Sequence, residues 1–218
     1  NEDLLIPILN SIPSTIEDIN ITMGLPLKQI PFAAFIDQWF QLQKEASSQY
    51  YYQDVISVLS HQFVRPLFQT QDKDAAQLII TTIKTQNLVS LTKDQISAIA
   101  PDYDTILGLL FGTWNDQPTK AIESVLTLIF RLKDYYSISK NNHLLPLEYL
   151  YRFSEIFNHL QRLNKSYSYL TSIKVLQTLY KELLSSETLD FKGQPLKGLQ
   201  IMGMLESRVL DFETVIIV

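Results

Sequence analysis

Apolar residues recur at every third or fourth position through the middle of the chain, which is the spacing of helices that bury one side. The first such stripe follows Pro31, a residue suited to the first helical position, and consists of Phe32, Phe35, Ile36, Trp39, Phe40 and Leu42. The same pattern predicts helices over residues 50–61, 72–83, 92–100, 104–111, 118–140, 146–163 and 170–183. Thr92 and Gln95 predict a capping box at one helix start. We therefore expect six to eight helices in the middle of the chain.

Many of the aromatic residues lie within these stripes. Aromatic side chains can stack on nucleic acid bases, but the helical spacing favours the core for Phe32, Trp39, Phe40 and residues 50–52. Trp114 lies in a loop outside the pattern, and we expect it to be exposed.

Strands are predicted near both ends of the chain. Residues 19–23 alternate apolar and polar positions up to a break at Gly24, residues 199–204 are apolar, and the β-branched run 214–218 fits a fully buried strand. Residues 185–194 predict a loose connection. The expected fold is mainly α with a small α/β part: one sheet domain formed by both chain ends and interrupted by a large all-helical insertion.

The two ends of the sequence also bear on its completeness. A buried strand that ends at Val218 would form a bare, aggregation-prone edge, and Asn1 is not an initiator methionine. We expect the chain to be a piece of a longer protein.

Composition narrows the classes of function. The 218 residues carry a net charge of -5, so the chain is not a free-standing basic nucleic-acid binder. The absence of cysteine excludes disulfides and thiolate metal sites and is compatible with the cytoplasm. No apolar run reaches membrane-spanning length, so no membrane partner is expected.

The charge is unevenly distributed. Residues 1–120 hold 7 Lys/Arg and 13 Asp/Glu, whereas residues 152–208 hold 8 Lys/Arg and 5 Asp/Glu. Any phosphate contact is therefore expected from the later half. The alternative is that these cations only belong to solvent-exposed helix surfaces and bind no ligand.

Two stretches resemble a known family. The order strand, Leu205-x-x-Arg208-x-x-x-Phe212, strand resembles motif V of UvrD-like superfamily 1 helicases, most closely the AddB and RecC type of subunit in bacterial helicase–nucleases. Residues 4–13 and 19–27 are similar to the start of the second motor domain in AddB-like proteins. The resemblance implies a partial RecA-like motor domain 2A over 1–31 and 192–218, and a helical insertion (2B-like) over 32–191.

The resemblance also implies site residues. Active members carry Thr-x-His-x-x-Lys-Gly-Leu-Glu-aromatic, in which His and Lys contact single-stranded DNA and the acid holds the nucleotide ribose. Gly203, Leu205, Arg208, Val209 and Asp211 stand for Thr, His, Lys, Gly and Glu. The implied DNA-binding residues are thus Arg208, Gly203 and Leu205, and the implied nucleotide-binding residue is Asp211.

These substitutions change the chemistry. Leu205 cannot donate a hydrogen bond, whereas Arg208 can hold a phosphate through two donors. Arg208 could instead pair with a nearby carboxylate such as Glu206, and Asp211 could be a turn or helix-start residue. The departures favour a helicase-like domain with weak or lost motor activity.

No catalytic site is predicted in the chain itself. The segment Gly193–Gly198 resembles a phosphate loop, but Leu199 follows where lysine is required. ATP and magnesium are therefore expected only in the parent protein, and the chain alone is not expected to hydrolyse ATP. The three histidines, His61, His143 and His159, lack metal-ligand spacing.

Two functions follow as hypotheses. In the first, the chain belongs to an ATP-dependent DNA helicase/nuclease-type protein in DNA repair and recombination, and contributes to the single-stranded DNA channel and the nucleotide cleft. In the second, the helicase-like fold is vestigial and the helical insertion docks a partner helicase–nuclease subunit.

Overall fold

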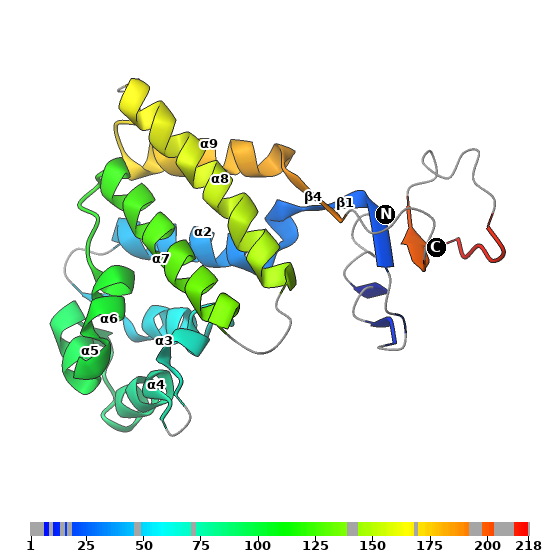
Figure 1. Cartoon of the computed structure of the whole chain (residues 1–218). Coiled ribbons are helices and arrows are strands. Elements are labelled where there is room, and N and C mark those ends of the chain that lie inside the picture. Colours follow the sequence, from blue (N-terminus) through cyan, green and yellow to red (C-terminus); the bar gives the residue numbers. More distant parts are fainter. Residues whose placement is uncertain are drawn as a thin grey trace. The chain divides into compact units, whose positions relative to one another are not determined.

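A computed structural model describes residues 7–8, 11–13, 16, 19–45, 49–70, 73–138, 144–167, 170–191, 198–202 and 212–217. The chain forms two compact units. We call Asn1–Leu27 with Glu187–Val218 the sheet unit, and Lys28–Ser186 the helical unit. The described residues are mainly helical, as predicted (Figure 1).

The helices follow the apolar stripes closely. They are α2 (Pro31–Glu45), α3 (Tyr52–Ser60), α4 (Ala75–Thr85), α5 (Lys93–Ile99), α6 (Asp104–Phe111), α7 (Pro118–Ile138), α8 (Leu144–Ser166) and α9 (Ile173–Ser186). Short 3-10 turns occupy Leu27–Gln29, Arg65–Phe68 and Pro101–Tyr103. The capping box of Thr92 and Gln95 is confirmed, with both of its hydrogen bonds present.

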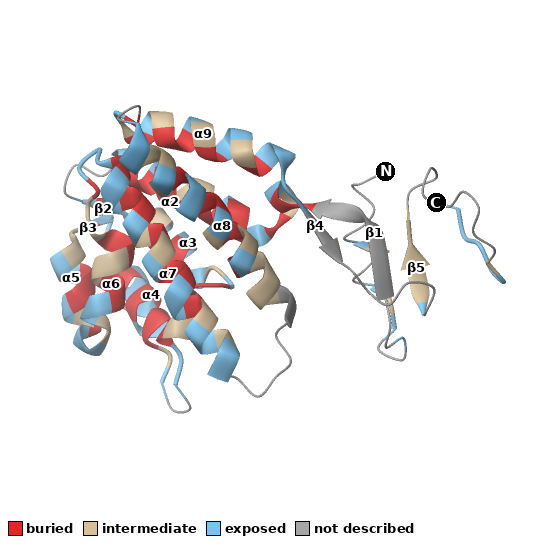
Figure 2. Ribbon diagram, turned by 45° about the horizontal axis from the view of Figure 1, so that its top comes forward, coloured by how far each residue is buried: buried red, intermediate tan, exposed pale blue. Residues whose placement is uncertain are grey.

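Aromatic side chains form the centre of the helical unit. On α2, Phe32 packs 5.0 Å from Phe153 of α8, and Phe40 lies 5.8 Å from Tyr180 of α9, measured between ring centroids. These rings are fully buried, and Figure 2 shows the buried sides of the helices facing one another. The prediction that the aromatic residues of α2 form the core is confirmed.

The prediction that Trp114 is exposed is wrong, because its side chain is only 1% exposed. Its ring packs 5.1 Å from Trp39 and 5.5 Å from Phe40, and its backbone N–H donates to Gln43 Oε1 at 3.0 Å. The following two residues have φ of 52° and 54°, and Gln117 N–H closes the turn on the Trp114 carbonyl at 3.0 Å. This tight turn directs the loop tryptophan into the core.

The prediction that a helix includes all of residues 50–52 is also wrong. Tyr50–Tyr51 form strand β2, which pairs antiparallel with β3 (Ser90–Leu91), and the helix begins at Tyr52. The Tyr52 N–H donates to the Val89 carbonyl at 3.0 Å, and the Tyr50 hydroxyl donates to the Phe111 carbonyl. These long-range hydrogen bonds hold the chain extended there.

In the sheet unit, strands from both ends of the chain are neighbours. The order is β4 (Thr188–Phe191), β1 (Ile19–Pro26), β5 (Leu199–Ile201). The β1–β5 pair is parallel and the β1–β4 pair antiparallel. This agrees with the expected meeting of residues 19–23 and 199–204 in one sheet.

Two details of the predicted strands need correction. Strand β1 does not break at Gly24 but continues to Pro26, with a register shift between Ile21 and Leu25. Part of the predicted loose connection 185–194 is strand β4. Both follow from antiparallel pairing: a bulge absorbs the irregular residues of one strand, and the pairing supplies hydrogen bonds that local sequence does not reveal.

The predicted buried strand over 214–218 is wrong for the residues that the structure describes. Thr214–Ile217 adopt no strand, and Val215, Ile216 and Ile217 are 66%, 82% and 91% exposed. Residues of this type favour strands only where neighbours supply hydrogen bonds and a packing surface. No described strand pairs with them. The assignment of the sheet as RecA-like stays a prediction.

Candidate nucleic-acid contact site

The residues that the motif resemblance implies, Gly203, Leu205, Arg208 and Asp211, lie outside the described residues. Strand β5 ends at Ile201, directly before them in sequence, and Phe212 after them is half-buried. The implied motif therefore follows the carboxyl end of a strand that pairs parallel with β1.

The histidines do not gather into a site. His61 lies half-buried 5.0 Å from the Phe35 ring, and its Nδ1 accepts from the Phe63 N–H at 3.4 Å. Burial lowers the pKa of His61, against a hydrogen bond with the Pro31 backbone that acts in the opposite direction. His159 is exposed, and His143 is outside the described residues. Within the described ranges, no three His, Asp or Glu side chains could hold a metal ion together.

At one end of the helical unit, α2 and α8 end and α7 and α9 begin (Figure 1). We call this region the basic end. Its cations are Lys44, Lys120, Arg162, Lys165 and Lys174. The acidic residues in the same segments are Glu45, Asp116 and Glu123. This local excess of positive charge contrasts with the net charge of -5 for the whole chain.

Hydrogen bonds between elements build the basic end. Asn164 Nδ2 on α8 donates to Thr119 Oγ1 on α7 at 2.8 Å, and the Ile173 N–H at the start of α9 donates to Asp116 Oδ1 at 2.8 Å. A depression of about 440 Å³ lies there, lined by Gln43, Lys44, Asn115, Asp116, Ile173 and Lys174. The end of α2, the start of α9 and the turn before α7 thus share one concave surface.

The cations of the basic end differ in their partners. Lys44 donates to Gln177 Oε1, and Lys120 donates to the Thr113 carbonyl, so both contact neutral oxygens. Arg162, Lys165 and Lys174 are exposed, and none of them makes an ion pair with a described residue. Three positive charges are therefore available to an external anion.

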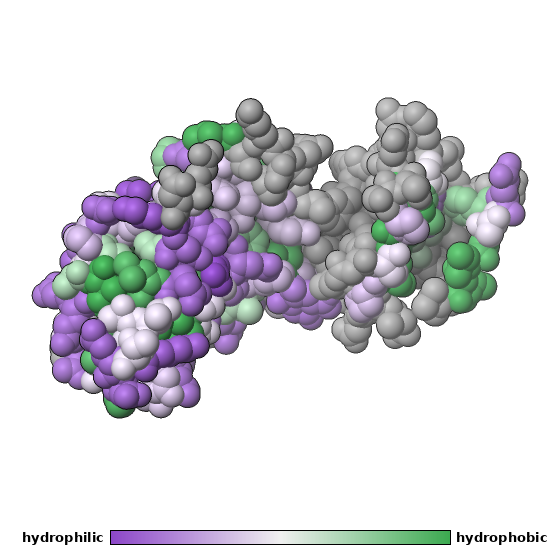
Figure 3. All heavy atoms as spheres, turned by 90° about the horizontal axis from the view of Figure 1, so that it is seen from below, coloured by the Kyte–Doolittle hydropathy of each residue, from purple (hydrophilic) through white to green (hydrophobic). Residues whose placement is uncertain are grey.

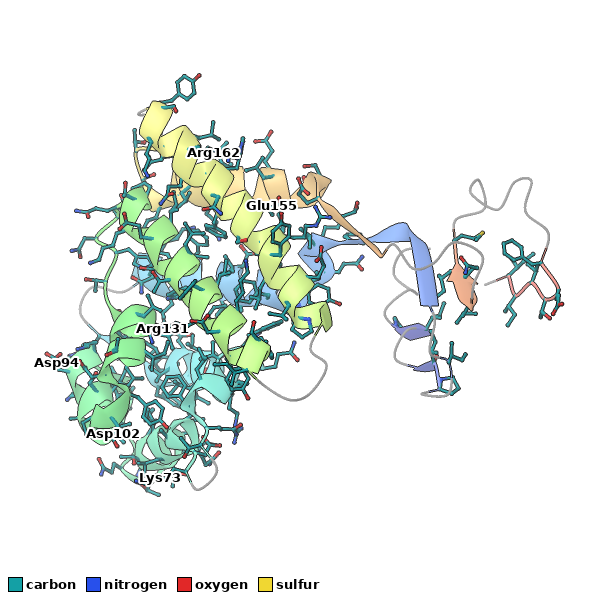
Figure 4. All side chains as sticks on the ribbon, in the orientation of Figure 1. Lys73, Asp94, Asp102, Arg131, Glu155 and Arg162 are labelled. Atoms are coloured by element: carbon teal, nitrogen blue, oxygen red, sulfur yellow. The ribbon has the colours of Figure 1, made fainter. Side chains whose placement is uncertain are left out.

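The first half of α8 provides the contrast. Arg152 pairs there with Glu148 and Glu155, each at 3.4 Å. Figure 4 shows Glu155 nearer the start of α8 and Arg162 nearer its end. The same helix thus carries paired charges in its first half and unpaired cations near its end.

A second depression lies on the α4–α5 side of the helical unit. It has a volume of about 270 Å³ and is lined by Lys73, Asp74, Ala75, Leu78, Ile99, Ala100, Pro101, Asp102 and Tyr103. Leu78 is 53% exposed, and Figure 3 shows an apolar patch on the α4–α5 side of the unit, surrounded by hydrophilic residues. This apolar groove suits a protein contact better than a phosphate.

Comparisons with protein-family models, curated proteins and solved structures find no match. Among the helices that the structure describes, none is both long enough and apolar enough to cross a membrane. Sequence reasoning anticipated cations in the later half of the chain but missed Lys44 and Lys120. They join the basic end only through the packing of α2 and α7, for which a single sequence carries no signal.

Proposed function

We propose that this chain belongs to a helicase-like protein that processes DNA, of the UvrD-like AddB and RecC type. The observation that carries the proposal is the parallel pairing of β1 with β5, two strands from opposite ends of the chain. The described helices α2–α9 lie between these strands in sequence. A sheet domain interrupted by a helical insertion is the organisation that the resemblance implies for domains 2A and 2B.

The position of the motif also supports the proposal. In sheets with parallel strands, ligands bind beyond the carboxyl ends of the strands. Strand β5 is parallel to β1 and leads directly into residues 203–211. We propose that Arg208 contacts a phosphate of single-stranded DNA and that Gly203 and Leu205 lie against the same DNA. Asp211 would contact the ribose of the nucleotide.

The chain would contribute one wall of a DNA channel and half of a nucleotide cleft. Because Leu205 replaces a histidine, it can exclude water but cannot donate to the DNA. Arg208 keeps a guanidinium suited to two hydrogen bonds with one phosphate. ATP and magnesium would bind only where a second motor domain of the parent protein completes the cleft, and a partner helicase–nuclease subunit would complete the assembly.

A titration of the chain with labelled single-stranded DNA tests this proposal. We expect weak binding that falls steeply with salt, and Arg208→Gln should weaken it about 5- to 10-fold, the size of one charged phosphate contact. Arg131→Gln, an exposed cation of α7, is the matched control and should change little. Binding that does not depend on salt, or that Arg208→Gln leaves intact, would contradict the assignment.

The second candidate is a vestigial helicase-like scaffold that docks a partner subunit. The apolar groove beside Leu78 favours it, because an exposed apolar patch within a hydrophilic surface is typical of protein interfaces. Leu78→Glu should then abolish association with the purified partner subunit, while Arg208→Gln leaves DNA binding by the assembly unchanged. The opposite pair of results favours the DNA channel.

A further inference from the structure

We propose that the basic end of the helical unit binds the phosphodiester backbone of a single-stranded nucleic acid. This surface is separate in sequence from the motif after β5. The identification of the ligand as single-stranded DNA rests on the proposed function, whereas the phosphate chemistry rests on the helical unit alone.

The first argument is the local charge. Residues 43–45, 112–123, 159–166 and 172–174 together hold five Lys/Arg and three Asp/Glu, whereas the whole chain holds 18 and 23. The positive excess is therefore concentrated where four helix ends meet.

The second argument is the position of the cations on the helices. Lys44 and Lys165 lie in the last turns of α2 and α8, where a cation stabilises the helix dipole. Lys120 is the third residue of α7 and Lys174 the second of α9, where a cation is unfavourable. Lys120 donates to the Thr113 carbonyl, which accounts for its position. Neither helix stability nor a described partner explains Lys174, and an external anion does.

The third argument is the shape of the surface. Two helices begin and two end here, so their dipoles largely cancel and the side-chain charges decide the potential. Lys44 and Lys174 line the depression. Arg162, labelled in Figure 4, and Lys165 lie on a separate helix, α8. A repeating backbone of phosphates can reach cations on several helices, and each contact releases a counterion. A chain of phosphates therefore fits the surface better than one free phosphate ion.

The test uses the whole 218-residue chain and a labelled single strand of roughly 16 nucleotides, measured by fluorescence anisotropy between about 50 and 200 mM salt. The variant Arg162→Gln/Lys165→Gln/Lys174→Gln removes the three unpaired cations. We expect about a 100-fold loss of affinity at about 0.1 M salt and a salt slope smaller by about 2, because each lost phosphate contact on a single strand contributes about 0.7 to the slope.

The matched control is Lys73→Gln/Lys84→Gln/Arg131→Gln, which removes the same charge from exposed positions on the α4 side and in the second half of α7. Its affinity should stay within about 2-fold of the parent chain, since distant exposed charges are screened. Circular dichroism and thermal melting of both variants exclude unfolding as the cause. Equal losses in both variants, or no loss in either, would overturn the proposal.

Competing ligands separate the possible sources of phosphate. Inorganic phosphate should displace the strand no better than chloride at the same ionic strength, and a duplex should bind more weakly than the single strand. Efficient displacement by phosphate, or tighter binding of the duplex, would overturn the assignment to a single strand. The Arg208→Gln variant tests the proposed function separately. If Arg208→Gln does not weaken binding but the triple variant of the basic end does, the assignment of Arg208 fails and the basic-end proposal stands.

Discussion

The α4–α6 side of the helical unit contains ion pairs, whereas the cations of the basic end form none with the described residues. On the α4–α6 side, Asp74 accepts from Arg65 at 2.9 Å and Asp104 pairs with Lys93 at 2.9 Å. At the basic end, Arg162, Lys165 and Lys174 make no ion pair with the described residues. Charges that already have partners stabilise local structure, whereas exposed cations without them are available to bind a ligand.

The α4–α6 side shows how a paired charge works. Asp74 is the N-cap of α4, and its carboxylate accepts from the Gln77 N–H at 2.9 Å. Burial alone would raise the pKa of Asp74, but the hydrogen bonds from Gln77, Gln69 and Arg65 lower it below its usual value. The carboxylate of Asp74 is therefore ionised and stabilises the start of α4.

The largest predicted effect concerns the loop that shapes the basic end. Trp114→Ala removes a buried ring from between Trp39 and Phe40 and should lower the free energy of unfolding by about 3–5 kcal/mol. Leu78→Ala on α4 should cost no more than about 0.5 kcal/mol, because that side chain is half exposed. Urea unfolding of both variants checks this, and similar costs for the two would show that the loop is not anchored through its tryptophan.

The next largest predicted effect concerns the helix-capping and ion-paired Asp74 on the α4–α6 side. Asp74→Ala removes the cap of α4 and should destabilise the chain by about 1 kcal/mol. Asp74→Asn keeps a capping oxygen and should retain most of this stability at pH 7. Neither change should alter binding of single-stranded DNA, and thermal melting together with a DNA titration measures both. Altered DNA affinity in either variant would break the contrast between the two sides.

A pH dependence is expected from His61. Its lowered pKa in the folded state means that the unfolded chain takes up a proton first as the pH falls. The contribution of His61 to stability is therefore complete above the usual histidine pKa of about 6.5, and it is lost as the pH falls below that value toward the lower folded pKa. Urea unfolding between about pH 7.5 and 5 should show this loss.

The matched variants are His61→Gln and His159→Gln, since His159 is exposed on α8. The loss of stability on acidification should shrink in His61→Gln and persist in His159→Gln. An unchanged slope in His61→Gln would assign the pH dependence to other groups.

The smallest predicted effect is a change in nucleic-acid affinity when Asp116 at the basic end is neutralised. Asp116→Asn keeps an oxygen that can accept the Ile173 N–H but removes a negative charge beside Lys174. Affinity for a single strand should rise about 2- to 3-fold at low salt, consistent with one charge near a screened surface. Asp102→Asn, exposed beside Lys73 in the other depression, should leave affinity unchanged. Weaker binding by Asp116→Asn would contradict the role of the depression.

Local signals in the sequence were sufficient for the helices. Pro31 begins α2, Thr92 with Gln95 caps α5, and Gly112 ends α6, because each of these residues acts on its own turn of chain. Two strands from the chain ends were predicted from period-2 alternation and apolar runs, and they pair as expected. Short-range rules thus describe most of the helical unit.

The errors share a cause, which is dependence on distant partners. Trp114 is buried because a tight turn delivers it to α2, and Tyr50 is extended because β3 pairs with its strand. Strand β4 forms against β1, while Val215 has β-branched neighbours but no described strand beside it. The basic end likewise exists only after four helix ends have packed together. None of these contacts leaves a periodic signal in one sequence.

The most direct measurement concerns the neighbouring strands β1 and β5, on which the helicase-like assignment depends. Asn20 and Gln200 are register partners, and the chain contains no cysteine, so Asn20→Cys/Gln200→Cys creates a single possible cross-link. We predict rapid formation of an intramolecular disulfide under mild oxidation. Cross-linking that is no faster than in the control Asn20→Cys/Thr188→Cys, whose second site is exposed on β4 opposite Pro26 at the other end of β1, would contradict the account.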